Sequence, residues 1–182
     1  MGNCILVTGG ARSGKSQYVM EQAVKTGKPV LFVATAEAGD AEMQARIEKH
    51  KKNRPANWKT LEVRSDVGKQ IEKNIGDAQT VIIDCITLLT TNNFMDNVSG
   101  KGKINEKKLE ENLDREIEGL LACANRVKAK FYIVTNEVGS GIVPEHPMSR
   151  LYRDLLGKAN QKLAQQASEV YFMVAGLPLR VK

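Results

Sequence analysis

The chain has 182 residues and a formal net charge of +6, with 42% hydrophobic and 26% charged residues. This length is typical of one domain, which we take as residues 1–182. No apolar run approaches the roughly 20 residues that span a bilayer, and the first apolar segment leads directly into a glycine-rich loop. We therefore expect a cytoplasmic protein with no signal peptide and no membrane partner.

The composition also argues against a nucleic-acid partner and against a cysteine metal site. A basic protein can bind nucleic acid or a polyphosphate substrate. Here the lysines are scattered, and four tyrosines, four phenylalanines and one tryptophan offer few stacking surfaces, so we expect no nucleic acid. Cys4, Cys85 and Cys123 share no metal-ligand spacing, and we expect reduced, mostly buried thiols.

A phosphate-binding loop follows the first strand-like run, residues 5–7. Its eight residues fit the pattern G-x-x-x-x-G-K-S: Gly9, Gly10, Ala11, Arg12, Ser13, Gly14, Lys15 and Ser16. In such a loop the backbone N–H groups surround the β-phosphate, the lysine contacts the β and γ oxygens, and the serine hydroxyl binds Mg²⁺. A helical pattern over 13–26 completes the strand, loop and helix context and argues against a chance glycine turn. The segment predicts binding of ATP or GTP.

Further apolar runs are typical of buried strands, and helical patterns separate them. The strands are expected at 30–34, 81–83, 131–134 and 170–174, and the remaining helices at 41–52, 105–127 and 148–167. Continuous apolar runs indicate a sheet covered on both faces. The alternation predicts an α/β fold with a mostly parallel central sheet flanked by helices. A last edge strand is expected after Pro178, ending at Val181, and the polar segment 96–108 is expected to form a mobile surface loop that enters a helix.

The helix predicted over 41–52 carries His50, for which two interpretations remain open. Met43, Ile47 and His50 fall on one helical face, which favours a partly buried, hydrogen-bonded side chain. The neighbouring cations favour another role, because nearby positive charge keeps an imidazole neutral near pH 7, and a neutral imidazole can attack phosphorus. The same cations could hold a triphosphate and stabilise a leaving pyrophosphate. They are Arg46, Lys49, Lys51, Lys52 and Arg54.

Asp84 follows the buried run 81–83 and is the candidate Mg²⁺ ligand. Open α/β sheets place ligands at the carboxyl ends of their strands, where an acidic residue complements a phosphate loop. A strand-terminal aspartate is also a common helix N-cap, so the residue alone does not decide between the two roles. The second histidine, His146, lies between Pro144 and Pro147 and is assigned at most a structural or substrate-proximal role.

These motifs, taken together, resemble the bifunctional adenosylcobinamide kinase and adenosylcobinamide-phosphate guanylyltransferase family of cobalamin biosynthesis. The phosphate loop is generic to many folds, whereas the run Thr135, Asn136, Glu137, Val138 and Gly139 is specific to this family. The resemblance covers nearly the whole chain. It rests on residues 5–16, 34–36, 40–55, Trp58, 84–88, Asn92, 135–145, Arg150, Arg153, Asp154, Gly157, Asn160, Gln161 and 174–178.

The resemblance implies a RecA-like P-loop NTPase fold, a homotrimer and two reactions. A nucleoside triphosphate first phosphorylates the aminopropanol hydroxyl of adenosylcobinamide, and GMP from GTP is then transferred to that phosphate to give adenosylcobinamide-GDP. The second step in the family uses a guanylylated histidine, which corresponds to His50. Lys15 and Mg²⁺ would offset charge in the first step. The implied nucleotide contacts are residues 9–16 of the phosphate loop, Ala34, Thr35, Ala36, Lys51, Lys52, Asn53, Arg54, Glu62 and Asp84, with Ser16 and Asp84 as metal ligands.

Some points stay open at this stage. Glu137 is either a base or substrate contact, or a hydrogen-bonding residue at the end of the sheet. The segment after Asp84 and the segment 96–108 depart from the family pattern, which puts corrinoid contact or subunit packing in doubt rather than the reaction class. The alternatives are a P-loop protein with only one of the two activities, or a nucleotide-dependent binding module.

Overall fold

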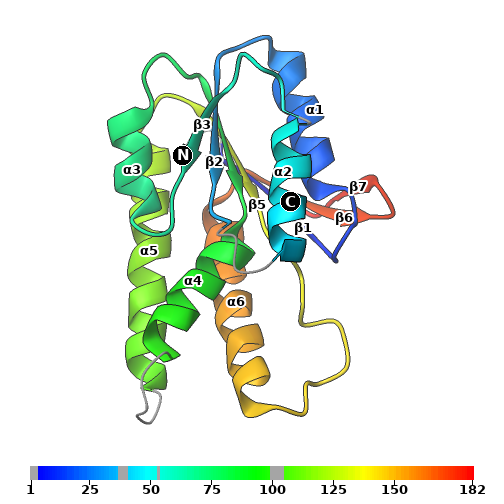
Figure 1. Cartoon of the computed structure of the whole chain (residues 1–182), viewed down its shortest axis with the longest axis vertical. Helices are drawn as coiled ribbons and strands as arrows, with labels where there is room; N and C mark the ends of the chain where they lie inside the picture. The colour runs from blue at the N-terminus through cyan, green and yellow to red at the C-terminus, as the bar shows by residue number, and fades with distance from the viewer. Residues whose placement is uncertain (1–3, 37–40, 53, 99–104) are drawn as a thin grey trace.

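The computed structural model describes residues 4–36, 41–52, 54–98 and 105–182. The described strands form one sheet in the order β3-β2-β4-β5-β1-β6-β7. All neighbours are parallel except β7, which pairs antiparallel with β6 (Figure 1). This arrangement confirms the predicted α/β class with a mostly parallel central sheet. The elements are β1 (Cys4–Gly9), α1 (Lys15–Thr26), β2 (Val30–Ala34), α2 (Ala41–Lys52), β3 (Lys59–Glu62), α3 (Val67–Asn74), β4 (Thr80–Asp84), α4 (Ile86–Val98), α5 (Glu106–Arg126), β5 (Lys130–Val134), α6 (Pro147–Gln166), β6 (Glu169–Val174) and β7 (Leu177–Arg180).

Both faces of the sheet carry an apolar core, because successive strand residues point to opposite sides. Leu6 of β1 packs into the core beneath α3, α4, α5 and α6. Its neighbours Ile5 and Val7 pack into the core on the other face, with Val19 and Ala23 of α1. The two helical layers lie on opposite sides of the sheet in Figure 1. Central strands buried on both faces explain why their sequences are almost uninterruptedly apolar.

The carboxyl ends of the central strands meet along one edge. Val7 pairs with Val134, Val134 with Asp84, and Asp84 with Ala34, so these residues form one row across four strands. The loops that leave this row carry most of the predicted site residues. The topology therefore brings together, at one edge of the sheet, loops that lie more than a hundred residues apart in the sequence.

Several helix ends follow local sequence. The helix predicted from residue 13 begins at Lys15, because Gly14 is left-handed at its N-cap. At the start of α5, the side chain of Asn105 accepts a hydrogen bond from Lys108 N at 3.0 Å, which satisfies an otherwise unpaired amide. The last edge strand includes Pro178 instead of following it and ends at Arg180, one residue before the predicted Val181. Proline is tolerated there because β7 is an edge strand.

The prediction of a loop over 96–108 was wrong at its start, whereas the helix predicted to follow it is confirmed. The helix α4 continues through Asp96 and Asn97, and α5 begins at Glu106. Polar side chains in this stretch find partners: Asp96 pairs with Arg64, and Asn97 Oδ1 accepts a hydrogen bond from Asn112 at 3.0 Å. Residues 99–104 of the predicted loop lie outside the described residues.

The elements β3, α3 and α4 had no counterpart among the sequence predictions. β3 is a four-residue edge strand whose side chains are mostly exposed, so it lacks an apolar run. α3 is eight residues long, and α4 mixes apolar residues with threonine and asparagine. Among the helices of the described ranges, none combines the length and apolarity needed to cross a bilayer.

Candidate functional site

The phosphate loop joins β1 to α1 in a conformation that its glycines permit. Gly9 has a φ of 148°, and a Cβ atom there would lie 2.6 Å from the carbonyl oxygen of Met173. Only glycine fits this position without displacing the β6 backbone. On the other side of the loop, Gly176 N donates to Ser13 O at 3.0 Å, so the turn between β6 and β7 supports the loop.

Lys15 points its ammonium group back into the loop. Its Nζ donates to Gly10 O at 2.6 Å and to Gly9 O at 3.1 Å, with Ser13 Oγ at 3.5 Å. Burial lowers the pKa of Lys15, whereas nearby Cys85 and Asp84 act in the opposite direction. A partly desolvated cation held by neutral carbonyls can exchange them for phosphate oxygens, which are stronger acceptors.

Asp84 and Ser16 supply the donor set expected for a magnesium nucleotide. Asp84 ends β4, as predicted, and is half-buried. Its charge acts on both Lys15 and Arg54, where it opposes the lowering of the pKa that burial causes. Ser16 follows Lys15 in the first turn of α1. Among the described residues, no three His, Cys, Asp or Glu side chains cluster as a metal site. One carboxylate and one hydroxyl fit Mg²⁺, which usually takes its other ligands from phosphates and water.

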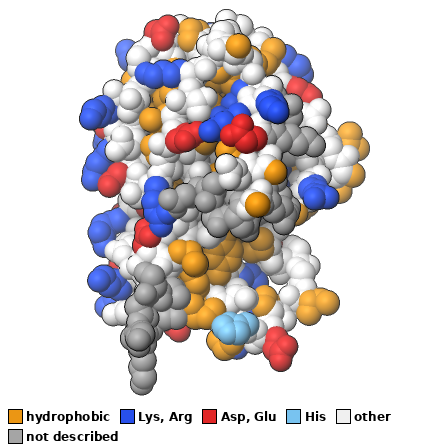
Figure 2. All heavy atoms as spheres, viewed as in Figure 1, with side chains coloured by type: hydrophobic (Ala, Val, Ile, Leu, Met, Phe, Trp, Pro, Cys, Tyr) orange, Lys and Arg blue, Asp and Glu red, His pale blue; other side chains and the backbone are white. Residues whose placement is uncertain are grey.

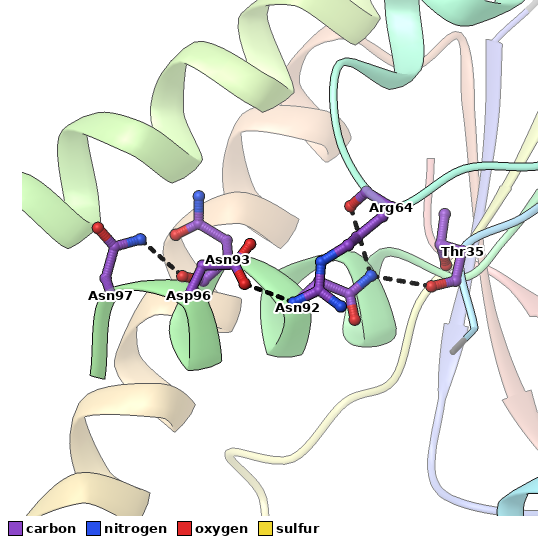
Figure 3. A network of polar contacts seen from close by, with 6 residues as sticks. All are labelled: Thr35, Arg64, Asn92, Asn93, Asp96 and Asn97. Atoms are coloured by element: carbon purple, nitrogen blue, oxygen red, sulfur yellow. Dashed lines mark hydrogen bonds and ion pairs between the residues drawn. The ribbon is translucent and has the colours of Figure 1, made fainter. Parts of the chain in front are cut away.

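Thr35 ties the end of β2 to the end of β4. Its hydroxyl donates to Cys85 O at 2.7 Å and accepts from Cys85 N at 2.9 Å, one residue after Asp84. The side-chain amide of Asn92 donates to Thr35 O at 3.0 Å and to Arg64 O at 3.4 Å (Figure 3). This network holds the backbone of Cys85, directly after Asp84, against the end of β2. The predicted nucleotide contact Thr35 therefore commits its hydroxyl to the protein, with Ala34 before it and Ala36 after it at the same edge.

The guanidinium of Arg54 stacks on the aromatic side chain of Phe32. Its guanidinium carbon is 3.8 Å from the centre of the Phe32 ring, and Trp58 stacks on Phe32 with ring centres 6.5 Å apart. Burial lowers the pKa of Arg54, and the charges of Asp84 and Glu62 raise it. Within the described part of the chain, the buried Nε has no hydrogen-bond partner. A stacked guanidinium with an unpaired Nε donor can still bind an anionic ligand through its fork of N–H groups.

The end of α2 meets the end of β3 through an ion pair. Lys51 Nζ lies 2.8 Å from Glu62 Oε1, and this carboxylate raises the pKa of Lys51. Figure 2 shows blue and red side chains close together on this face. Lys52 is exposed at the last position of α2. All three residues, Lys51, Lys52 and Glu62, were predicted to contact the nucleotide, and the structure pairs Lys51 with Glu62.

The backbone of His50 lies in α2, as the helical prediction required. The side chains of His50, Arg46 and Lys49 lie outside the described part of the structure, as does the whole of Asn53. Neither interpretation of His50 is therefore tested by contacts. The helix places its backbone two residues before the end of α2 and four residues before Arg54.

The two other polar candidates have structural contacts. Glu137 N donates to Gly9 O at 3.0 Å, and its Oε1 accepts from Gly139 N and from Ser140 N, the latter at 3.1 Å. Of the two roles left open for Glu137, this contact pattern favours hydrogen bonding at the end of the sheet. His146 is exposed and caps α6, because its Nδ1 accepts from Met148 N at 3.3 Å.

The cysteines match their prediction. Cys4, Cys85 and Cys123 are free and buried. Burial raises the pKa of Cys4 and of Cys123 to about 11, and that of Cys85 to about 12. Thiols with such values are protonated and unreactive near neutral pH.

Three parts of the site had no prediction. Phe32 was predicted only as a strand residue, and Trp58 and Asn92 only as part of the family pattern. A single apolar residue in a strand carries no signal that a cation will stack on it. Asn92, which follows apolar residues within α4, was the one available hint, because a buried amide needs hydrogen-bond partners.

Comparisons with known proteins agree over almost the whole chain. The family described as cobinamide kinase / cobinamide phosphate guanyltransferase matches residues 5–181. The chain is 40% identical over 180 residues to "Bifunctional adenosylcobalamin biosynthesis protein CobU" of Escherichia coli, covering 98% of this chain and 99% of that protein. It is 37% identical over 177 residues to "Bifunctional adenosylcobalamin biosynthesis protein CobP" of Pseudomonas aeruginosa, covering 97% and 96%.

A solved structure supports the fold independently. The crystal structure of the RadB recombinase aligns with a TM-score of 0.51 at 14% identity, covering 93% of this chain and 73% of that chain. At this identity the likeness concerns the fold alone. It confirms the expected RecA-like arrangement around a phosphate loop.

Proposed function

The chain belongs to the cobinamide kinase / cobinamide phosphate guanyltransferase family, and on this basis we propose that it catalyses both reactions. In the first, a nucleoside triphosphate phosphorylates the aminopropanol hydroxyl of adenosylcobinamide. In the second, GMP from GTP is transferred to adenosylcobinamide phosphate, giving adenosylcobinamide-GDP. The observation that carries this proposal is the phosphate loop with Lys15 buried in it and Asp84 at the end of a neighbouring strand.

In the kinase step, the residues of this chain position and neutralise the triphosphate. We propose that Lys15 leaves Gly9 O and Gly10 O and contacts the β and γ oxygens, while the loop N–H groups bind the β-phosphate. Ser16 and Asp84 would hold Mg²⁺, which would supply charge neutralisation when bound. The acceptor hydroxyl attacks the γ-phosphorus, loses its proton, and the bond to the nucleoside diphosphate breaks.

In the transfer step, His50 is proposed as the nucleophile. A neutral imidazole nitrogen attacks the α-phosphorus of GTP; the P–N bond forms as the bond to pyrophosphate breaks, leaving a guanylyl-histidine. A phosphate oxygen of the acceptor then forms the new P–O bond, and the P–N bond breaks. Arg54, Lys51 and Lys52 lie near the end of the same helix and supply positive charge for the triphosphate and the leaving pyrophosphate.

Two substitutions separate these roles. His50→Ala should abolish GMP transfer and leave most of the kinase rate, because the nucleophile serves one step only. Lys15→Ala should slow both steps by about 100-fold or more, because the loop serves the nucleotide in each. Rates with ATP and GTP, measured on folded variants, test this division. An equal loss of kinase activity in His50→Ala would contradict it.

The intermediate can be observed directly. The protein with Mg²⁺ is incubated with GTP labelled at the α-phosphorus and then denatured. Acid-labile, base-stable label on the peptide that contains His50 is expected, and none in His50→Ala. No label on a folded, GTP-binding wild-type protein would leave the single-activity kinase or a nucleotide-binding module as the better assignment.

The remaining parts of the proposal follow from family membership. We propose that residues 1–182 act as one catalytic domain, that the protein is a cytoplasmic homotrimer, and that it has no nucleic-acid partner. Light scattering of the purified protein tests the trimer. Binding to single-stranded DNA that weakens as salt rises would contradict the last point.

A further inference from the structure

A pocket outside the predicted nucleotide residues lies between the turn after β5 and the helix α6. It has a volume of about 380 Å³, and its lining includes Glu137, Arg153, Asp154, Gly157, Asn160 and Gln161. All six carry the family resemblance in the sequence, yet none of their side chains belongs to the phosphate-loop motif; of the six, Glu137 contacts the loop, through its backbone N–H at Gly9 O. The pocket therefore groups residues that the nucleotide site leaves without a role.

The pocket is fixed to the edge of the sheet where the phosphate loop begins. Glu137 N donates to Gly9 O at 3.0 Å, so the turn that forms one wall starts beside the loop. Asn160 of the opposite wall donates from Nδ2 to Asn136 O at 3.0 Å and accepts from Thr135 Oγ1 at 2.7 Å. Both walls are thus tied to the carboxyl ends of β1 and β5, next to the position expected for the transferred phosphate.

The charged residues that line the pocket are Glu137, Arg153, Asp154 and Lys158, and Lys158 Nζ pairs with Glu110 Oε1 at 2.6 Å. With both cations paired to carboxylates, the pocket favours a neutral polar ligand over a second triphosphate. Arg153 Nε and Nη2 lie 3.2 Å and 3.1 Å from Asp154 Oδ1, so the cation is already neutralised by its neighbour. The Arg153 side chain is 23% exposed, that of Asp154 is 59% exposed, and a guanidinium has five N–H donors. Donors and an acceptor side by side match a primary carboxamide, whose C=O accepts while its NH₂ donates.

The loop that continues from the pocket residue Gly139 carries exposed aliphatic side chains. In the loop that follows the turn, Ile142 is 97% exposed and Val143 is 63% exposed. Exposed aliphatic side chains beside a polar pocket are typical of a binding surface. A ligand with an apolar ring and amide side chains would use both parts.

We propose that this pocket binds carboxamide side chains of the corrinoid acceptor in both reactions. The proposal rests on the proposed function, since it names where the second substrate of that function is held. A cavity of this volume takes the amide-bearing edge of a corrin ring, while the ring itself lies against the apolar loop. Arg153 donates to the amide oxygens, and Asp154 accepts from the amide nitrogens.

A substitution that fills the pocket tests the proposal. A Cβ atom added at Gly157 meets nothing within 4 Å, so Gly157→Leu should fold and project into the pocket. We expect the KM for adenosylcobinamide and for its phosphate to rise at least about tenfold, with the KM for GTP and the labelling of the protein by GTP alone unchanged. Gly119→Leu is the matched control, because Gly119 also lies in a helix and its added Cβ also meets open space.

A second variant tests the chemistry rather than the space. Asp154→Ala removes the acceptor that we assign to the amide nitrogens and should weaken cobinamide binding by about tenfold, as for a hydrogen bond to a charged group. Cobinamide itself is the probe, since equilibrium dialysis can follow its visible absorption. Arg126→Ala, which breaks the exposed pair between Arg126 of α5 and Glu72 of α3, is the control.

The outcomes separate this inference from the proposed function. Wild-type acceptor KM values in both folded pocket variants would overturn the inference and leave the two reactions intact. A raised KM for GTP would assign the pocket to the nucleotide, and an altered oligomeric state in Gly157→Leu would assign it to subunit packing; either overturns it. A wild-type protein that neither binds cobinamide nor turns over the acceptor would refute the proposed function as well.

Discussion

At the scale of single residues, Arg54 shows how a side chain can be stabilised without a full set of hydrogen bonds. Stacking on Phe32 compensates part of the cost of burying a guanidinium, and the charges of Asp84 and Glu62 oppose the lowering of its pKa. The unused donors are then available to a ligand. A lysine cannot reproduce this arrangement, because an ammonium group is not planar, does not stack on a ring as a guanidinium does, and lacks its fork of parallel N–H donors.

Arg54→Lys should therefore raise the KM for GTP by about tenfold, the equivalent of about 1.4 kcal/mol, while the free energy of unfolding changes by less than about 1 kcal/mol. Arg126→Lys serves as the control, because the exposed guanidinium of Arg126 donates to Glu72, away from the phosphate loop. Steady-state kinetics and urea denaturation give the two quantities. An unchanged KM would remove Arg54 from the nucleotide site.

Thr35 gives a second test at this scale. The side chain is 1% exposed, and Thr35→Val keeps its shape but removes both hydrogen bonds to Cys85. The buried N–H and C=O of Cys85 then lose a partner, which should lower the free energy of unfolding by about 1–3 kcal/mol. Thr35→Ser keeps the hydroxyl and loses only a methyl group, at about 1 kcal/mol. Equal destabilisation of the two variants in urea would show that the hydroxyl does not hold these strands together.

At the scale of elements, the crossing of α3 and α5 depends on one small residue. A Cβ atom added at Gly68 would lie 2.3 Å from Gly119 O, a backbone atom that cannot move away alone. The close contact is what brings Val67 and Ile71 into the core beneath α5. A side chain at Gly68 must push the two helices apart.

Gly68→Ala should lower the free energy of unfolding by about 2–3 kcal/mol, as other overpacked positions do. Gly119→Ala, on the facing helix, adds a methyl group in open space and should raise it by up to about 1 kcal/mol, because alanine favours helix over glycine. Thermal or urea unfolding of the pair measures both. A stable Gly68→Ala would mean that the helices separate at little cost.

The same scale shows which elements a sequence can predict. The strands β1, β2, β4 and β5 are buried on both faces and β6 is partly buried, so their apolar runs were sufficient. The side chains of β3 are mostly exposed, and the strand forms because its backbone pairs with that of β2. This pairing is not visible in the local sequence of β3. In α4, the Asp96 carboxylate pairs with Arg64, and the Asn97 side-chain oxygen accepts a hydrogen bond from Asn112. Both partners come from distant parts of the chain. Composition alone therefore favoured a loop.

At the scale of the whole molecule, the predicted nucleotide residues gather because the strands that carry them end at one edge. The sequence predicted the phosphate loop from spacing and Asp84 from the rule that ligands bind at strand ends. It could not predict that Arg54 would stack on Phe32, or that Asn92 would hold Thr35, since both depend on side chains from separate elements. The role of His50 stays a prediction from family resemblance and charge.

The buried thiols make the stability of the whole molecule depend on alkaline pH. Burial raises the pKa of Cys4 to about 11 from 9.0, so the unfolded chain loses this proton at lower pH than the folded protein. The stabilisation is complete below pH 9 and is lost as pH rises towards 11. The free energy of unfolding should fall over this range, and fall less steeply in Cys4→Ala. Parallel curves for the two proteins, measured by urea unfolding, would contradict the assignment.

The position of β1 in the sheet has a consequence for how the protein is made. During synthesis β1 precedes both of its partners, β5 and β6, by more than a hundred residues, and the turn that supports Ser13 lies at Gly176. The nucleotide loop therefore lacks its support until these later strands have been synthesised. Until then β1 is an unpaired apolar strand, and such strands are the parts of a growing chain that are prone to aggregate.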